Sequence, residues 1–210
     1  EDTLEGNITA DRTISAANKN FLKGFVYVKS GATLTIEAGS VIKGISVASG
    51  ERAASLIIEP GAKIIAEGTV DKPIVFTSDK EPGKRVTGDW GGLIICGNAR
   101  VNRTNQPTIE GGPGTHYGNT TSDEFNGESS GKLKYVRIEF AGYPLEPDKE
   151  INGLTFGGVG SGTEVEFVQV SYSNDDSYEW FGGTVNAKHL IAYKGWDDDF
   201  DTDYGYTGKL

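Results

Sequence analysis

Short alternating runs of hydrophobic and polar residues recur along the chain, and each run ends at a turn that contains glycine. Residues 34–39 (LTIEAG) and 56–61 (LIIEPG) match in Leu, Ile, Glu and Gly, 22 positions apart. An apolar pair follows each copy, at 41–42 and at 64–65, and a further apolar run lies at 73–77. Alternation with a period of two predicts β-strands rather than helices.

The same interval returns in the second half of the chain. Residues 174–179 (NDDSYE) match 196–201 (WDDDFD) in their acidic and aromatic positions, again 22 apart. The strand-like runs 167–172 and 189–194 share this register. The repeat therefore extends over most of the chain.

A third repeat sets 154–158 (LTFGG) against 179–183 (EWFGG), 25 positions apart. One coil of this length cannot bury its own apolar face, so coils must stack and pair in parallel, about 4.8 Å apart. The sequence thus predicts an all-β fold, a right-handed parallel β-helix with about 22 residues per coil. In that fold Glu37 should lie beside Glu59, and Asp175 beside Asp197.

Two other repeat folds fit the pattern less well. A leucine-rich repeat has an overlapping period, but it needs a helical segment and an asparagine ladder in each repeat. A propeller blade needs about 40–50 residues. Neither requirement is met by the runs described above.

The pattern divides the chain into a cap and one solenoid domain. Residues 1–20 are polar, and we expect them to form an N-terminal cap. Residues 21–210 should form the β-helix, with an inserted loop at 98–131 that is rich in Gly, Asn and Thr. A loop of this length is usually functional or mobile. We also expect the chain to be truncated at its C-terminus, since an acidic coil ends at Leu210 without a cap.

Composition and charge exclude several classes of partner. The chain has 30 Gly and 7 Pro in 210 residues, as expected of an all-β protein with many turns. Its net charge of −10 would repel nucleic-acid phosphates, so we expect no nucleic-acid partner. No apolar run reaches the roughly 20 residues of a transmembrane helix. Methionine is absent even at position 1, so we expect a processed or partial product.

The single cysteine, Cys96, allows no internal disulfide. It lies in the apolar run 93–96, where we expect it to be a small buried hydrophobic residue.

The most specific chemical feature is an acidic run at 197–203 (DDDFDTD), which holds five Asp. Stacked coils would bring it next to the acidic residues one interval earlier, and such carboxylates repel one another unless a cation lies between them. Ca²⁺ prefers six to eight oxygen ligands, and the run is no EF-hand loop. Two alternatives stay open: a solvated acidic ridge, and a site for Ca²⁺ or a similar divalent cation among Asp175, Asp176, Glu179, Asp197, Asp198, Asp199, Asp201 and Asp203.

Aromatic residues crowd the last forty positions of the chain. If exposed, they could stack on sugar rings; if buried, they would form a core ladder. We expect about half of them to be core, and we expect ligand binding by Trp180, Trp196, Tyr178 and Tyr204.

Catalytic signals are weak. The only histidines are His116, in the inserted loop, and His189, which matches Phe167 one interval earlier and should be inward or half-buried. No nucleophile elbow, zinc-protease motif or phosphate loop is present. A polysaccharide lyase would need a base facing the acidic group across a groove, and the candidates by position are Lys188, Lys194 and Arg137.

Several longer motifs support a family resemblance. They are 24–34 (GFVYVKSGATL) with 39–44 (GSVIKG), 89–93 (DWGGL), 135–142 (YVRIEFAG) with 150–160 (EINGLTFGGVG), and 175–186 (DDSYEWFGGTVN) with 197–203. From about residue 20 onward, the chain resembles the β-helix surface proteins and lipoproteins of Bacteroidetes. The resemblance implies a protein that is secreted or held on the extracellular face of the outer membrane, as part of a nutrient-uptake or adhesion assembly. It implies no catalytic residues.

Together these features favour a non-catalytic cell-surface binding module, stiffened by Ca²⁺. Its partner would be a surface glycan, a peptide, or an outer-membrane transporter or lipoprotein complex. Two alternatives stay open: a polysaccharide lyase or glycoside-degrading enzyme, and a structural spacer that associates with itself.

Overall fold

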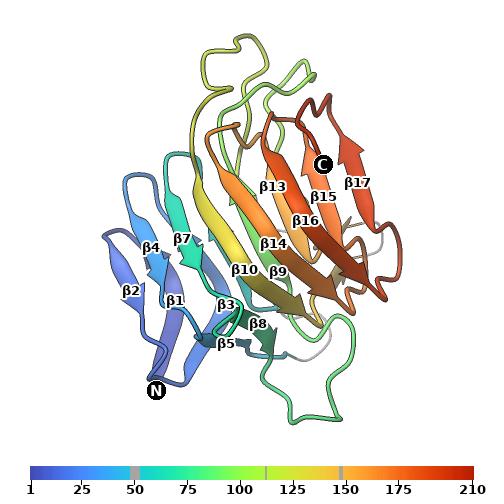
Figure 1. The fold of residues 1–210 in the computed structure, drawn as a ribbon. Helices are drawn as coiled ribbons and strands as arrows, with labels where there is room; N and C mark the ends of the chain where they lie inside the picture. Colours follow the sequence, from blue (N-terminus) through green and yellow to red (C-terminus); the bar gives the residue numbers. More distant parts are fainter. Residues whose placement is uncertain (48–52, 112, 147–148) are drawn as a thin grey trace.

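The strands of this chain stack in parallel along one axis, so that the sequence runs from one end of the stack to the other (Figure 1). The computed structural model describes residues 1–47, 53–111, 113–146 and 149–210. In these ranges the fold is a parallel β-helix, as predicted, and the paired strands are all parallel except β11 (Pro144–Glu146) and β12 (Lys149–Glu150). No described segment is a helix long and apolar enough to cross a membrane.

Each coil passes over three faces, which we name A, B and C. Face A, in front in Figure 1, consists of β2 (Arg12–Ile14), β4 (Thr33–Ile36), β7 (Lys63–Glu67) and the first parts of β10 (Gly131–Glu139), β14 (Glu164–Ser171) and β16 (Asn186–Tyr193). Face B holds the first parts of β1 (Asp2–Ile8) and β3 (Asn20–Val28), then β5 (Val41–Gly44), β8 (Ile74–Ser78) and the later parts of β10, β14 and β16. Face C holds the later parts of β1 and β3, then β6 (Ser55–Ile58), β9 (Gly92–Cys96), β13 (Leu154–Gly157), β15 (Tyr178–Phe181) and β17 (Phe200–Asp203).

The 22-residue interval is correct only near the two ends of the stack. Tyr178 pairs with Phe200 at this spacing. In the N-terminal half, however, Leu34 pairs with Ile64 on face A, and Leu56 pairs with Val26 on face C, both 30 residues apart. The prediction that Glu37 and Glu59 stack is therefore wrong, because they follow strands on different faces.

The repeat of 34–39 in 56–61 has a local explanation instead. In each copy the glycine has a positive φ, 86° at Gly39 and 82° at Gly61. Both segments are short strands that end in a left-handed turn residue, a conformation that glycine adopts without steric cost. The shared pattern therefore reflects two corners of the same kind, and not two strands that stack on each other.

The offset of 25 residues taken from the third repeat is one residue longer than the pairing in the structure. Leu154 pairs with Tyr178, so the offset is 24 rather than 25. A shift of one residue moves a strand's side chains to the opposite face. It places Tyr178 inside the coil and Glu179 outside.

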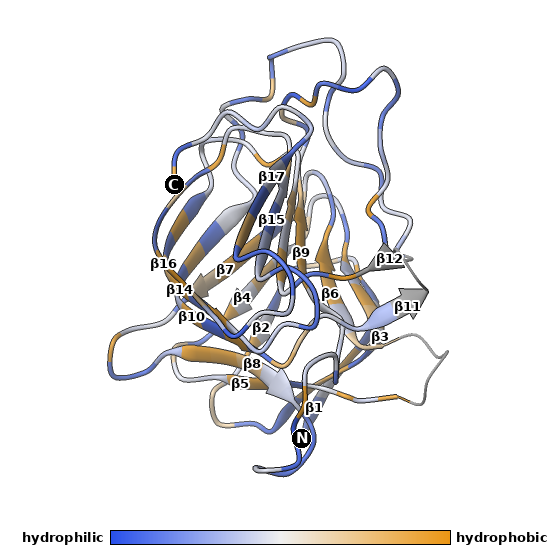
Figure 2. Ribbon diagram, turned by 90° about the vertical axis from the view of Figure 1, so that its right-hand side faces the viewer, coloured by the Kyte–Doolittle hydropathy of each residue, from blue (hydrophilic) through white to orange (hydrophobic). Residues whose placement is uncertain are grey.

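The interior is a continuous column of apolar side chains. On face C, Leu56, Leu93, Leu154 and Tyr178 lie one above another and are at most 1% exposed. Figure 2 shows hydrophobic colour on β6, β8 and β9, whereas the last strand, β17, is mainly hydrophilic. At the C-terminal end the core is aromatic, with Tyr178 stacked on Phe200 at 5.3 Å between ring centroids.

Two of the residues that the sequence led us to expect as ligand-binding are core residues instead. Tyr178 and Trp180 are fully buried, and Trp180 stacks on Phe156 at 5.5 Å. Their rings serve as core, since no solvent-borne ligand can reach them without unfolding the last coils.

Flat aromatic stacks line the corner between faces A and B. Tyr135, Phe167 and His189 occupy equivalent positions in successive coils, each with a positive φ between 51° and 57°. The ring centroids of Tyr135 and Phe167 are 4.7 Å apart, and those of Phe167 and His189 are 4.4 Å apart. Such backbone is strained for residues other than glycine, and ring stacking offsets part of that cost. His189 is exposed on this corner, so the expectation of an inward or half-buried His189 is wrong.

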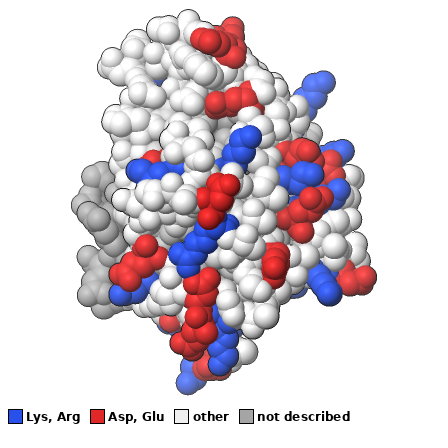
Figure 3. Space-filling view, turned by 90° about the vertical axis from the view of Figure 1, so that its left-hand side faces the viewer, with Lys and Arg blue, Asp and Glu red and all other residues white. Residues whose placement is uncertain are grey.

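Charged side chains of both signs are interspersed on the outer surface near the N-terminal end (Figure 3). Ion pairs such as Arg12–Asp2, at 2.5 Å, and Lys23–Glu5, at 3.0 Å, belong to the first two coils. Residues 1–20, expected as a cap, thus form β1 and β2 in register with the coils that follow. They bury Leu4, Ile8 and Ile14.

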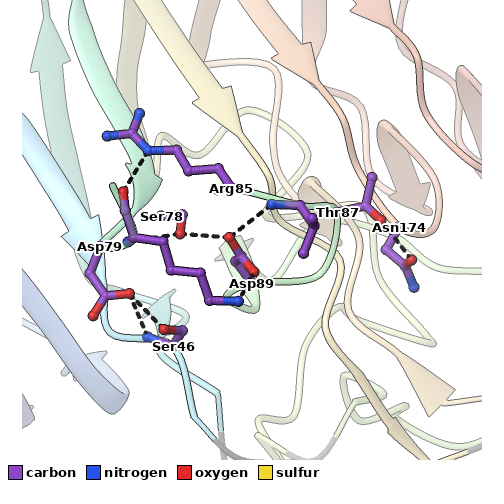
Figure 4. Close-up of polar contacts among 9 residues, drawn as sticks. Ser46, Ser78, Asp79, Arg85, Thr87, Asp89 and Asn174 are labelled. Carbon is purple, nitrogen blue, oxygen red and sulfur yellow. Dashed lines mark hydrogen bonds and ion pairs between the residues drawn. The ribbon is translucent and has the colours of Figure 1, made fainter. Parts of the chain in front are cut away.

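The turn between β8 and β9 is fixed by a buried carboxylate. Asp89 is 4% exposed and accepts hydrogen bonds from the Ser78 hydroxyl, at 2.7 Å, and from the Lys80 ammonium, at 2.6 Å. Farther along the same turn, the Thr87 hydroxyl donates to Asn174, two coils away, at 3.0 Å (Figure 4). The turn therefore ties coils together at the corner between faces B and C.

The inserted loop covers the outside of face C. Between β9 and β10 the described residues make only two isolated bridges. Val101, Ile109 and Tyr117 of the loop pack with Ile94, Cys96 and Phe181 in a second buried cluster. Gly157 permits this contact, because a Cβ there would lie 2.8 Å from the Tyr117 ring. Cys96 is buried as predicted, and burial raises the pKa of its thiol.

Removing one rung of the corner stack should destabilise the fold. Phe167→Ala deletes two ring contacts, each worth about 0.5–1.5 kcal/mol beyond area burial, so we expect a loss of about 1–3 kcal/mol in the free energy of unfolding. Urea denaturation followed by circular dichroism measures it. Phe125→Ala is the matched control, since both side chains are 37% exposed and Phe125 has no stacked ring among the described residues. Equal losses in the two variants would show that stacking contributes nothing.

Candidate functional site

Acidic residues gather on the outside of face C in the last coils. Alternation along β15 directs Tyr178 and Trp180 inward and Glu179 outward. The next coil places Asp201 directly beside Glu179 in the register of β17. Like charges are thereby stacked on adjacent strands, which is unfavourable without a compensating group.

Two groups of carboxylates lie close enough to share a cation. Asp175, Asp176 and Asp197 form one group, and Asp176, Glu179 and Asp201 form the other, with ligand atoms within 4.8 Å of one another in each. The predicted approach of Asp175 to Asp197 is confirmed. Asp176 belongs to both groups and links them.

Burial perturbs both central acids. Asp176 is 9% exposed and Glu179 is 6% exposed. Loss of solvent raises the pKa of Glu179 to about 9, and the negative charges of Glu110 and Asp176 add to the effect. Burial also raises the pKa of Asp176 to about 6, although the backbone N–H of Asp198, at 2.9 Å, opposes the shift. Burial therefore opposes ionisation of both carboxylates, much more strongly at Glu179 than at Asp176, and a nearby cation would relieve that cost.

Asn152 is a neighbour of Glu179 that sequence analysis missed. It is 2% exposed, and its Nδ2 donates a hydrogen bond to Oε2 of Glu179. Its own Oδ1 is buried without a hydrogen-bond partner. Carboxylate and amide oxygens are the ligands that Ca²⁺ prefers. No periodic signal marked Asn152, because it lies in the turn before β13, outside the repeated runs.

The other predicted ligands lie apart from these groups. Asp198, Asp199 and Asp203 are exposed and belong to neither group found among the described residues. Asp198 contributes through its backbone, since its N–H binds Asp176. The structure thus brings together five of the eight predicted side chains.

Comparison with known proteins identifies the family. A family model described as a pectate-lyase-like β-helix domain matches residues 6–210, nearly the whole chain. The chain belongs to the pectate-lyase-like β-helix domain family. No curated protein and no solved structure matches it. For this member of the family, function must be argued from its own side chains.

The remaining aromatic candidates differ in exposure. Trp196 is 80% exposed at the turn before β17. Tyr204 is half-buried, because its ring packs on Phe181 and lies under the Arg103 guanidinium at 4.3 Å. Of the four residues expected to bind ligand, Trp196 alone offers most of its ring to solvent.

The inserted loop of this family member reaches the acidic coils. The backbone N–H of Asn102 donates to the Tyr204 carbonyl at 2.9 Å, and that of Gly183 donates to the Arg100 carbonyl at 2.8 Å. Glu110, in the same loop, adds negative charge near Glu179. The loop forms one side of the acidic site.

Two of the three candidate lyase bases lie on other faces than the acids. Lys188 is on face A, where its ammonium pairs with Glu166 at 2.8 Å. Arg137 is on face B, at a cavity of about 460 Å³ beside the corner stack. The Lys194 ammonium lies 5.7 Å from the centre of the Tyr172 ring. Lys188 and Arg137 therefore form no acid–base groove with the acids of face C, whereas Lys194 lies at the corner between β16 and β17.

Without divalent cations, Glu179 should make the protein less stable as the pH rises. Folding raises the pKa of Glu179 from its usual 4.5 to about 9, so its contribution to stability is fully present below 4.5 and is lost as the pH rises through 9. In chelator, we expect the free energy of unfolding to fall between about pH 5 and about pH 9, by on the order of 2 kcal/mol or more.

Glu179→Gln keeps the acceptor for Asn152 but cannot ionise, so most of this fall should disappear. Glu124→Gln, at an exposed position of the inserted loop, is the control and should retain it. Urea denaturation at several pH values gives the slopes. An unchanged slope in Glu179→Gln would assign the pH dependence to other groups.

Proposed function

We propose that this chain is a non-catalytic binding module of the cell surface, a β-helix whose last coils are stiffened by Ca²⁺ and whose outer faces hold a surface glycan. The observation that carries the proposal is the close group of Asp176, Glu179 and Asp201, of which the first two are buried, beside Asn152, whose Nδ2 binds Glu179 and whose Oδ1 has no partner. Asp176 and Glu179 are buried without a basic partner in the contacts described above.

Electrostatics supports a cation rather than protons alone. At neutral pH the raised pKa keeps Glu179 protonated when no cation is present, and one bound cation allows all three acids to ionise. Ca²⁺ fits better than Mg²⁺, since Ca²⁺ accepts irregular sets of oxygen ligands, whereas Mg²⁺ demands a near-ideal octahedron. Bound Ca²⁺ would hold β15 and β17 together at the end of the stack.

The placement of acids and bases favours binding over catalysis. A glycosidase uses one carboxyl group to protonate the leaving oxygen, and that group must reach the substrate. Glu179 has the raised pKa of such an acid, but it is 6% exposed beneath the inserted loop. A lyase base would have to act beside the cation, and Lys188 and Arg137 lie on other faces.

The charge and the fold favour a glycan partner. A rigid solenoid displays long side-chain arrays to an extended ligand. The net charge of −10 disfavours nucleic acid and anionic lipid as partners. Exposed Trp196 is suited to stack on a sugar ring of a glycan.

Ca²⁺ should raise the midpoint of thermal unfolding. A ligand at about 100 times its Kd stabilises by about 2.7 kcal/mol, which for a chain of this size corresponds to about 5–10 °C. Differential scanning calorimetry with Ca²⁺, with Mg²⁺ and with chelator measures the shift. Glu179→Gln and Asp201→Asn should each abolish most of the Ca²⁺ effect.

Asp199→Asn is the matched control, because it removes an exposed acid of the same run that belongs to neither carboxylate group. It should keep the full shift. A wild-type chain that responds to Ca²⁺ no more than to Mg²⁺, or a loss of response in Asp199→Asn as large as in Asp201→Asn, contradicts the proposed site.

A further inference from the structure

A cavity of about 410 Å³ lies where the tip of the inserted loop meets the outside of face C in the first three coils. Its size is within the range of small-molecule sites, about 300–1,000 Å³. Six of its lining residues carry polar side chains, namely Asn7, Tyr27, Lys29, Glu59, Thr115 and His116. It lies far along the stack from the acidic coils, in different strands.

The walls of this cavity are held in place by hydrogen bonds. The Tyr27 hydroxyl donates to the carbonyl of Pro113, in the loop, at 3.0 Å. The backbone N–H of Ile109 donates to the Thr115 carbonyl at 2.9 Å, which closes the loop tip on itself. The loop is therefore fixed both to face C and internally, and the cavity is a built feature of the fold.

Thr115 forms part of the cavity wall, but its hydroxyl does not open into the cavity. The residue is 7% exposed, and its Oγ1 is buried without a hydrogen-bond partner in the protein. The polar side chains available to a ligand include Lys29 and Glu59, which keep part of their surface exposed.

The charged groups of the cavity balance one another. The Lys29 ammonium lies 2.6 Å from Oε1 of Glu59, and both side chains keep part of their surface exposed, 37% and 19%. The same ammonium lies 5.4 Å from the centre of the Tyr27 ring. An anionic ligand would meet the Glu59 carboxylate, and a cationic ligand would meet Lys29. A neutral ligand with many hydroxyls can accept from Lys29 and donate to Glu59 at once.

We propose that this cavity is a subsite for a neutral saccharide unit, bound by the Lys29–Glu59 pair and the Tyr27 ring. The inference rests on the proposed glycan-binding function and gives it a location. The site needs no cation, so saccharide binding here should not depend on whether Ca²⁺ binds to the acidic coils.

Saturation-transfer NMR and calorimetry with glucose, galactose and N-acetylglucosamine test the subsite, in Ca²⁺ and in chelator. Galacturonate and glucosamine are the anionic and cationic counterparts. We expect at least one neutral sugar to bind at millimolar concentration, equally with and without Ca²⁺, and more tightly than its charged counterpart. The double variant Lys29→Gln with Glu59→Gln, which keeps the charge balance, should weaken binding roughly 10-fold or more.

The controls are Lys63→Gln, at an exposed position of face A, and Thr104→Val, at an exposed position of the same inserted loop. Both should bind as the wild type does. The subsite is refuted if no neutral sugar binds, if a charged counterpart binds more tightly, or if the folded double variant binds as the controls do. If circular dichroism shows that a cavity variant does not fold, the relative affinities of the wild-type chain for neutral and charged sugars still test the subsite. Retention of a polysaccharide by the folded double variant at wild-type strength would leave the module a glycan binder and remove this subsite from it.

Discussion

Parallel pairing between successive coils is the interaction on which the rest of this structure depends. Each strand of faces A, B and C finds its hydrogen-bond partners in the coils before and after it, and almost none within its own coil. Side chains at equivalent positions therefore lie one above another at the strand spacing of about 4.8 Å. The core column, the aromatic corner stacks and the acidic groups all follow from that single constraint.

Stacking favours apolar and aromatic residues and penalises charge. The column Ile57, Ile94, Thr155, Glu179 and Asp201 on the outside of face C passes from apolar to acidic along the axis. Under the inserted loop the apolar members form a second buried cluster. Where the column turns acidic, the same geometry forces carboxylates together and makes a partner for them necessary. The proposed Ca²⁺ site is thus a consequence of the repeat as much as of the residues in it.

The inserted loop gives this solenoid its asymmetry. Faces A and B expose their outward side chains, whereas face C is covered by residues that interrupt the repeat. One loop provides the Val101, Ile109 and Tyr117 contacts, a side of the acidic site, and the roof of the cavity beside Lys29 and Glu59. Both proposed binding sites therefore lie where the repeated coils meet the inserted loop. This agrees with the general placement of functional groups on loops that a rigid scaffold holds in position.

Sequence alone determined the strands, the parallel β-helix, the burial of Cys96 and the approach of Asp175 to Asp197, because alternation and a constant interval near the C-terminus are local signals. Tertiary structure decided the rest. On face C the intervals between paired residues are 20, 30, 37, 61, 24 and 22, since corners and loops of different length lie between coils and carry no periodic signal. For that reason the stacking of Glu37 on Glu59, the exposure of Tyr178 and Trp180 and the burial of His189 could not be read correctly from the pattern. Asn152 beside Glu179, and the loop tip over Tyr27, are contacts between segments far apart in the chain, and only the pairing of whole coils brings such segments together.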